Sequence, residues 1–189
     1  MNVAELAPGL WRWTAPHPDW KQGDDWEQAV GCVYYEAPRA TVLIDPLVPT
    51  ERERFLEALD RDVERRGLPV SILLTCAWHG RSSGELAERY GAATGGSPDG
   101  LVAVGFPVAE ETMYWLPEQR TLVTGDSLMG DGLGGLTICP DTWLEGDRPQ
   151  LLRRDLRSLL DLPVERILVS HGDAVLEDGR AALERALRG

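Results

Sequence analysis

Several residue types are scarce in this 189-residue chain, and each scarcity argues against a class of protein. Lys21 is the only lysine, and 31 acidic residues against 19 basic ones give a net charge of −12. Nucleic acids and anionic membranes bind basic surfaces, so we expect neither as the main partner. No apolar run approaches the roughly 20 residues of a transmembrane helix. The N-terminus lacks the basic start and apolar block of a secretion signal, which favours a cytoplasmic protein.

Cysteine is also rare, although a thiolate is a common zinc ligand. Cys32, Cys76 and Cys139 lie far apart and form no CxxC pair, so we expect no structural zinc knuckle. Cys32 and Cys139 stand in apolar segments, which is typical of reduced, buried thiols. Reduced thiols agree with a cytoplasmic location.

The order of strands and helices in the first half of the chain repeats after Leu101. Apolar runs and alternation predict the strands, and apolar faces predict the helices at 50–66 and 147–160. Thr50 and Ser82 each begin a capping-box spacing, Gly91 ends the helix after Ser82, and Asp178 begins the last helix. The first half has strands at 10–14, 30–36, 41–44 and 71–75 and helices at 50–66 and 83–90; the second has strands at 101–104, 113–116, 121–124 and 167–170 and helices at 147–160 and 178–187. No linker divides the halves. We therefore predict one α+β domain, residues 1–189, folded as a four-layer αββα sandwich.

One loop concentrates the chemically reactive side chains. In SILLTCAWHGRSSGELAERYG, residues 71–91, a buried strand leads through a loop into a helix. α/β proteins place their chemistry where a strand's carboxyl end meets a helix's amino end. This loop holds Cys76, Trp78, His79 and Arg81 within six residues.

Four segments in the correct order resemble the metallo-β-lactamase fold, over nearly the whole chain. TVLIDP at 41–46 resembles the family's strand that ends in aspartate. LPEQRTLVTGD resembles the hairpin that delivers the bridging aspartate, here Asp126, and ILVSHG the segment that delivers the last histidine ligand, here His171. LLTCAWHGRSSG at 73–84 stands where the family has Leu-Leu-Thr-His-x-His-x-Asp-His-x-x-Gly.

The resemblance implies a two-metal hydrolase, but the metal motif departs from the family pattern. Cys76 and Trp78 stand at the first two histidines, Gly80 at the aspartate and Arg81 at the third histidine. Residues 106–110, FPVAE, lack the family's middle histidine. Because the chain has only three histidines, the ligand count excludes a family-type two-metal site.

We expect Arg81 to replace the charge of the missing metal. A guanidinium cannot bind a cation, but it can pair with Asp126, with Glu110 or Glu111 close by. A buried aspartate without a partner would cost about 3–5 kcal/mol. Trp78 is expected to fill the volume that metal and water vacate. No cofactor is therefore expected.

Two functions remain open from the sequence. The first is a metal-free protein that binds a small molecule or a protein partner with little hydrolysis, through a pocket lined by Cys76, Trp78, Arg81 and Glu110. The tryptophan loop at residues 15–28 is a candidate surface for a protein partner. The competing structural readings are that these tryptophans plug the edge of the core and that Cys76 is only a small buried thiol. Oligomeric state stays open.

The second function is a hydrolase of the ester, thioester or lactone type. Its catalytic candidates are His171, Asp126 and His79, because histidine is the side chain that titrates near neutral pH. Cys76 is a candidate nucleophile, with either histidine as its base. A single zinc or iron on Asp126, His171 and Cys76 is the metal-dependent alternative. The structural reading of His79 is a surface or packing residue.

Overall fold

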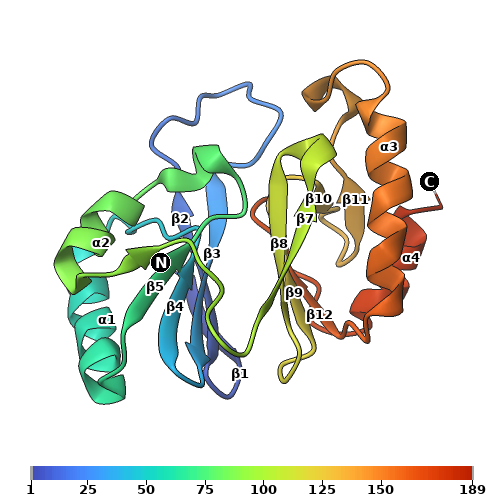
Figure 1. Ribbon diagram of the computed structural model, residues 1–189. Coiled ribbons are helices and arrows are strands. Elements are labelled where there is room, and N and C mark those ends of the chain that lie inside the picture. Colours follow the sequence, from blue (N-terminus) through green and yellow to red (C-terminus); the bar gives the residue numbers. More distant parts are fainter. Residues whose placement is uncertain (1, 189) are drawn as a thin grey trace. The chain divides into compact units, whose positions relative to one another are not determined.

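A computed structural model describes residues 2–188 of the chain, which divides into two compact units. Unit 1 ends at Leu101 and unit 2 begins at Val102, which is the point where the order of elements begins to repeat. Each unit consists of a mixed β-sheet with helices against one face (Figure 1). Among the described residues, no helix is long and apolar enough to cross a membrane.

Unit 1 is built on a six-stranded sheet with the order β1-β2-β3-β4-β5-β6. Neighbouring strands are antiparallel from β1 to β4, and β5 runs parallel to both β4 and β6. Helices α1 and α2 cover one face of this sheet, and a 3-10 turn, η1, precedes α2 (Figure 1). The bounds are β1 Asn2–Ala7, β2 Leu10–Pro16, β3 Ala29–Ala37, β4 Ala40–Ile44, α1 Arg52–Arg66, β5 Val70–Leu73, η1 Ala77–Gly80, α2 Ser83–Tyr90 and β6 Ala93–Thr94.

The core of unit 1 lies between this sheet and its two helices. Phe55 and Leu59 of α1 and Leu86 of α2 pack against buried strand residues, among them Leu43 and Ile72. The spacing along α1 is the apolar periodicity that predicted this helix from the sequence, whereas α2 was predicted from a capping-box spacing and from Gly91. The crossover from β4 through α1 to β5 makes these two strands parallel neighbours.

Unit 2 repeats this plan with a four-stranded sheet of order β12-β9-β8-β7 and a separate two-stranded hairpin, β10-β11. β12 is parallel to β9, and the other neighbours are antiparallel. Helices α3 and α4 lie against one face of the sheet (Figure 1). The bounds are β7 Val102–Phe106, η2 Pro107–Ala109, β8 Glu111–Leu116, β9 Thr121–Val123, β10 Leu128–Gly130, β11 Leu136–Ile138, η3 Asp141–Trp143, α3 Arg148–Asp155, η4 Leu156–Asp161, β12 Arg166–Leu168 and α4 Gly179–Ala186.

The predicted start of α2 at Ser83 is confirmed, but both predicted capping boxes are wrong, and so is the predicted start of α1. Neither α1 nor α2 has a side-chain cap: α1 begins after Glu51, not Thr50. The Ser82 hydroxyl oxygen instead accepts a hydrogen bond from the backbone N–H of Val48 at 2.9 Å. Ser82 therefore stabilises the loop after β4 and does not cap its own helix.

Three further differences concern element bounds. Strand β1 was not expected from the sequence, and residues 128–138, expected to be irregular from residue 130, contain the β10-β11 hairpin. The helix expected over 147–160 is α-helical only to Asp155 and continues as the 3-10 helix η4. The hairpin pairs residues close together in sequence, such as Met129 and Thr137, but its glycine-rich connection gave no clear strand pattern.

Candidate functional site

In each unit, a parallel strand pair brings an acid and a histidine together. β4 and β5 are parallel neighbours in unit 1, and the Asp45 N–H just beyond β4 donates to Leu73 O at 3.0 Å. Parallel strands end at the same edge of a sheet. Asp45, which follows β4, therefore lies beside Thr75 and the loop that carries His79, which follow β5.

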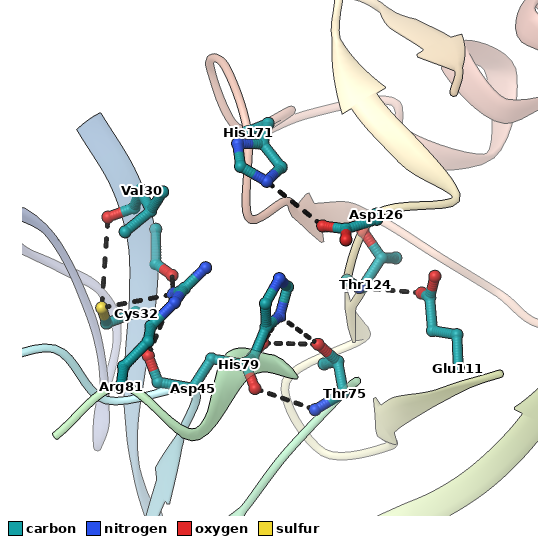
Figure 2. A network of polar contacts seen from close by, with 12 residues as sticks. Val30, Cys32, Asp45, Thr75, His79, Arg81, Glu111, Thr124, Asp126 and His171 are labelled. Carbon is teal, nitrogen blue, oxygen red and sulfur yellow. Dashed lines mark hydrogen bonds and ion pairs between the residues drawn. The ribbon is translucent and has the colours of Figure 1, made fainter. Parts of the chain in front are cut away.

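Asp45 is the centre of a buried hydrogen-bond network in unit 1 (Figure 2). Its Oδ1 accepts the Thr75 N–H at 2.8 Å, and its Oδ2 accepts the Thr75 hydroxyl at 2.5 Å. The His79 Nδ1 lies 2.9 Å from Asp45 Oδ2 and 2.9 Å from Thr75 Oγ1. Asp45 and His79 are 3% and 4% exposed, so these bonds are shielded from water.

The network determines the tautomer of His79. An ionised carboxylate only accepts hydrogen bonds, so Nδ1 carries the proton that His79 donates to Asp45. In the neutral ring, Nε2 then holds the lone pair. A carboxylate behind Nδ1 makes Nε2 a better base or ligand, as in catalytic and metal-binding histidines. His79 is therefore not the surface residue that one reading of the sequence offered.

The described hydrogen bonds of Arg81 are to residues of its own unit. Its Nη1 donates to Gly31 O and Asp45 O, each at 3.1 Å, and lies 3.9 Å from the Cys32 Sγ. These bonds hold the loop after β5 against β3 and the end of β4. Burial raises the pKa of the Cys32 thiol to about 11, and Arg81 opposes this, so Cys32 stays a neutral thiol. The ion pair between Arg81 and Asp126, which the sequence suggested, stays a prediction.

Cys76 and Trp78 lie on opposite sides of the turn η1. Cys76 is 2% exposed, and its Sγ lies within 4.8 Å of a ring nitrogen of His79. Trp78 is 55% exposed and lies edge-on to the His79 ring at 6.3 Å between centroids. The expectation that Trp78 fills a buried volume is therefore wrong. In this turn the side chain of His79 faces inward, and that of its neighbour faces outward.

Unit 2 contains the corresponding pair. The Thr124 N–H beyond β9 donates to Leu168 O of the parallel strand β12 at 2.9 Å. The residues that follow the two strands are Asp126 and His171. The Asp126 Oδ1 lies 3.2 Å from the His171 Nε2, and both side chains are largely buried (Figure 2). The structure thus joins two catalytic candidates that lie 45 positions apart in the sequence (171 − 126 = 45).

Glu111 supports the loop that carries Asp126. Its carboxylate accepts the N–H groups of Gly125 and Ser127, each at 2.8 Å. Desolvation by burial raises the pKa of Glu111, and these hydrogen bonds oppose that effect, while the charge of Asp126 adds to it. Glu110, the neighbour proposed as a pocket residue, is exposed and pairs with Arg148 at 3.4 Å. The sequence suggested either glutamate, and only Glu111 contacts this loop.

The loop that carries His171 is held by a close backbone approach. The Gly130 N–H of β10 donates to His171 O at 2.9 Å. A Cβ at Gly130 would lie 2.4 Å from backbone atoms of Asp173, and one at Gly172 would lie 2.9 Å from Gly130 O. Only glycine fits at such distances. On its other side, the His171 ring lies edge-on to Trp143 of η3 at 6.2 Å.

The tryptophan loop of unit 1 makes contacts within itself. The Trp20 indole N–H donates to Trp26 O at 2.8 Å, and the His17 ring lies edge-on to Trp26 at 5.3 Å. His17 thus contacts Trp26 within this loop.

The residues present do not fit a two-metal centre. At the motif positions, the Trp78 indole offers only an N–H donor, Gly80 has no side chain, and the Arg81 cation is bound to two carbonyls. Each of these would leave a metal position without a ligand.

Side chains that can bind a metal occur in each unit among the described residues: Cys76 and His79 in unit 1, and Asp126 and His171 in unit 2. A catalytic zinc takes about three protein ligands, so neither pair suffices within its own unit.

The sequence did not reveal which residues contact His79, His171 and the loop that carries Asp126. Asp45 was noted only as the end of a strand, and Glu111 only as an alternative to Glu110. Thr75 and Trp143 were not considered. A signal existed for Asp45, because an acid that follows a buried strand is a common position for a functional carboxylate. No local pattern pointed to Trp143.

Comparisons with known proteins identify the fold. No protein-family model and no curated protein matches the sequence. Solved structures match over nearly the whole chain. VMB-1 at pH 5.5 is 13% identical with a TM-score of 0.65, and the match covers 99% of this chain and 94% of that one. DIM-1 metallo-beta-lactamase is 11% identical with a TM-score of 0.63, covering 98% and 97%.

A metallo-beta-lactamase from Erythrobacter litoralis is 18% identical with a TM-score of 0.61, and the match covers 98% of this chain and 90% of that one. Identities this low support a common fold and leave the activity open. The two mixed sheets with flanking helices confirm the predicted α+β class. The chain has the metallo-β-lactamase fold.

Proposed function

We propose that this chain works without a two-metal centre and binds a small molecule, with little or no hydrolysis. One observation carries the proposal: in each unit, a histidine held by a carboxylate lies edge-on to a tryptophan. In unit 1 the residues are Asp45, His79 and Trp78, and in unit 2 they are Asp126, His171 and Trp143.

Such pairs suit recognition of small molecules. Binding sites combine aromatic surface with a few polar groups in fixed orientation. His79 meets the second condition, because Asp45 and Thr75 fix its ring. Trp78 meets the first, because more than half of its side chain is open to a ligand. The charge of Arg81 stabilises the loop between them without a metal.

The first test measures metal content and ligand binding together. We expect protein purified without chelator to contain far less than one zinc or iron per chain by mass spectrometry. In a thermal-shift screen of small metabolites, a ligand that stabilises the protein should bind about tenfold more weakly to Trp78→Ala. Val3→Ala, which truncates another exposed apolar side chain of unit 1, is the matched control and should bind normally. Near-stoichiometric metal would contradict the proposal.

A specific observation favours a second candidate, a metal-independent thiol hydrolase. The Cys76 Sγ lies within 4.8 Å of a ring nitrogen of His79, whose Nδ1 is held by Asp45. A cysteine next to a histidine oriented by a carboxylate is the arrangement of a nucleophile with its base. The thiol would give its proton to His79 and attack an ester, thioester or lactone carbonyl, and the alcohol or thiol would leave with that proton as the acyl bond to it breaks. Water would then hydrolyse the acyl-thiol intermediate, which releases the acid and restores the Cys76 thiol.

Chelator resistance and a cysteine substitution separate the two candidates. If the chain is a thiol hydrolase, turnover of a thioester should be unchanged by EDTA and fall at least 100-fold in Cys76→Ala. Cys139→Ala, which removes another buried thiol, should keep most of the activity. Activity that survives Cys76→Ala but is lost in His171→Ala would assign the chemistry to unit 2 instead. The absence of turnover with every carbonyl substrate would leave small-molecule binding as the function.

A further inference from the structure

A cavity of about 350 Å³ opens on unit 2, and none of its lining residues belongs to the loops that carry His79 and His171. Its walls come from three elements: Leu136, Thr137 and Ile138 of β11, Arg153 of α3, and Arg185 with Ala186 of α4. The size falls within the range of small-molecule sites, which is roughly 300–1,000 Å³. None of these residues takes part in the proposed function.

The charge of this cavity is opposite to that of the chain. The protein carries a net charge of −12, yet the two charged side chains that line the cavity are both arginines. Guanidinium groups bind phosphate oxygens through paired N–H donors. Two of them at one cavity provide the charge that a phosphate dianion requires.

The acids nearby leave this positive charge only partly neutralised. Asp141 lies 3.2 Å from Arg153 in an exposed ion pair, which a stronger anion can replace because such pairs contribute little. Among the described residues, Arg185 has no ion pair. Asp131 interacts with Arg185 only weakly: its pKa is lowered chiefly by the N–H groups of Leu133 and Gly135, and the Arg185 charge is a minor cause. The Asp131 carboxylate thus bonds mainly with the backbone of its own loop.

Beside the arginines, the lining offers the exposed Thr137 and a small apolar surface that can contact the organic part of a ligand. Leu136 and Ile138 are nearly buried, and Ala186 lies beside them on the cavity wall. The Thr137 hydroxyl donates to Ile138 O at 3.2 Å and can turn to a phosphate oxygen. A free phosphate ion would leave this apolar surface without a contact.

We propose that the cavity between β11, α3 and α4 binds a phosphate monoester of a small organic molecule through Arg153 and Arg185. The site is independent of the proposed function, and either one can fail without the other.

The test uses calorimetric titration of the full chain with phenyl phosphate and with inorganic phosphate, at constant ionic strength. We expect saturable binding of phenyl phosphate with a dissociation constant in the millimolar range or below, at least fivefold tighter than that of inorganic phosphate. Arg185→Gln and Arg153→Gln should each weaken binding about tenfold. Arg180→Gln is the matched control, because Arg180 lies on the same helix but pairs with Glu184 outside the cavity.

Each outcome decides the matter. Thermal unfolding of the variants should stay within about 2 °C of the parent, so that loss of binding reports the site and not misfolding. No saturable binding, or equal weakening in all three variants, would overturn the site. Equal affinity for the two anions would overturn the assignment to a monoester.

Discussion

Replacing Asp45 with alanine is expected to lower the free energy of unfolding by about 3–5 kcal/mol, the largest effect among the substitutions considered for unit 1. The change removes the acceptor of three buried donors, which are the Thr75 N–H, the Thr75 hydroxyl and the His79 Nδ1–H. The His79 Nδ1–H can still donate to Thr75 Oγ1, but the Thr75 N–H and the Thr75 hydroxyl would remain buried without an acceptor, at about 1–3 kcal/mol apiece. Urea denaturation followed by circular dichroism measures the effect.

The control for Asp45 is an aspartate with an exposed partner. Asp62 bonds only with Arg65 at the surface in the contacts described for it, so Asp62→Ala should cost less than about 1 kcal/mol. If the network acts as a unit, His79→Ala should cost less in the Asp45→Ala background than in the parent. An Asp45→Ala protein within 1 kcal/mol of the parent would contradict the importance of this network.

Replacing Glu111 with alanine is expected to cost about 2–4 kcal/mol, the largest effect expected in unit 2. The Glu111 carboxylate accepts the N–H groups of Gly125 and Ser127, which flank Asp126. Without it, both amides are buried and unsatisfied, and the Asp126 loop loses its support. Glu110→Ala is the matched control: this neighbouring glutamate has an exposed ion pair with Arg148 and should change stability by less than about 1 kcal/mol.

Glu111 also gives a prediction about pH. Its folded-state pKa is raised above the ordinary value of 4.5, first by burial and in part by the charge of Asp126. A raised acid pKa means that the folded state holds the proton more tightly than the unfolded state. The contribution of Glu111 is therefore most favourable below pH 4.5 and declines as the pH rises from there to the folded-state pKa.

The measurement compares how the free energy of unfolding changes with pH in the parent and in a Glu111 variant. Unfolding free energies of the parent and of Glu111→Gln, taken from urea titrations between pH 4 and 7, should diverge: the parent should lose stability relative to the variant as the pH rises. Parallel curves would show that Glu111 has the same pKa in both states. A difference of the opposite sign would mean that the two backbone N–H bonds outweigh burial.

The described bonds of Arg81 add to the charge argument made from the sequence, in which its pair with Asp126 stays a prediction. Arg81 was expected to neutralise Asp126, because it stands where the family has a metal ligand. Its described bonds go to Gly31 O and Asp45 O in its own unit, and the described partner of Asp126 is His171. A guanidinium has five N–H donors and can bind main-chain carbonyls as well as carboxylates, so its position in a motif does not by itself determine its partners.

The sequence by itself determined much about this protein. Apolar patterns predicted most strands and α1, and a capping-box spacing with Gly91 predicted α2. The order of segments indicated the metallo-β-lactamase fold, which the solved structures confirm. The replacements at Trp78, Gly80 and Arg81 excluded a two-metal site, because ligation depends on residue type. The position of Asp126 and His171 directly after strands marked both as site candidates.

Only the tertiary structure decided what these residues contact. Strand pairing joins segments far apart in the chain, and nothing local specifies that β5 lies beside β4 or β12 beside β9. Those two parallel pairs bring Asp45 to His79 and Asp126 to His171. The turn η1 then decides that His79 faces inward and Trp78 outward, since the two neighbours cannot share one side. The sequence therefore indicates which side chains are reactive, and the pairing of strands determines which residues those side chains contact.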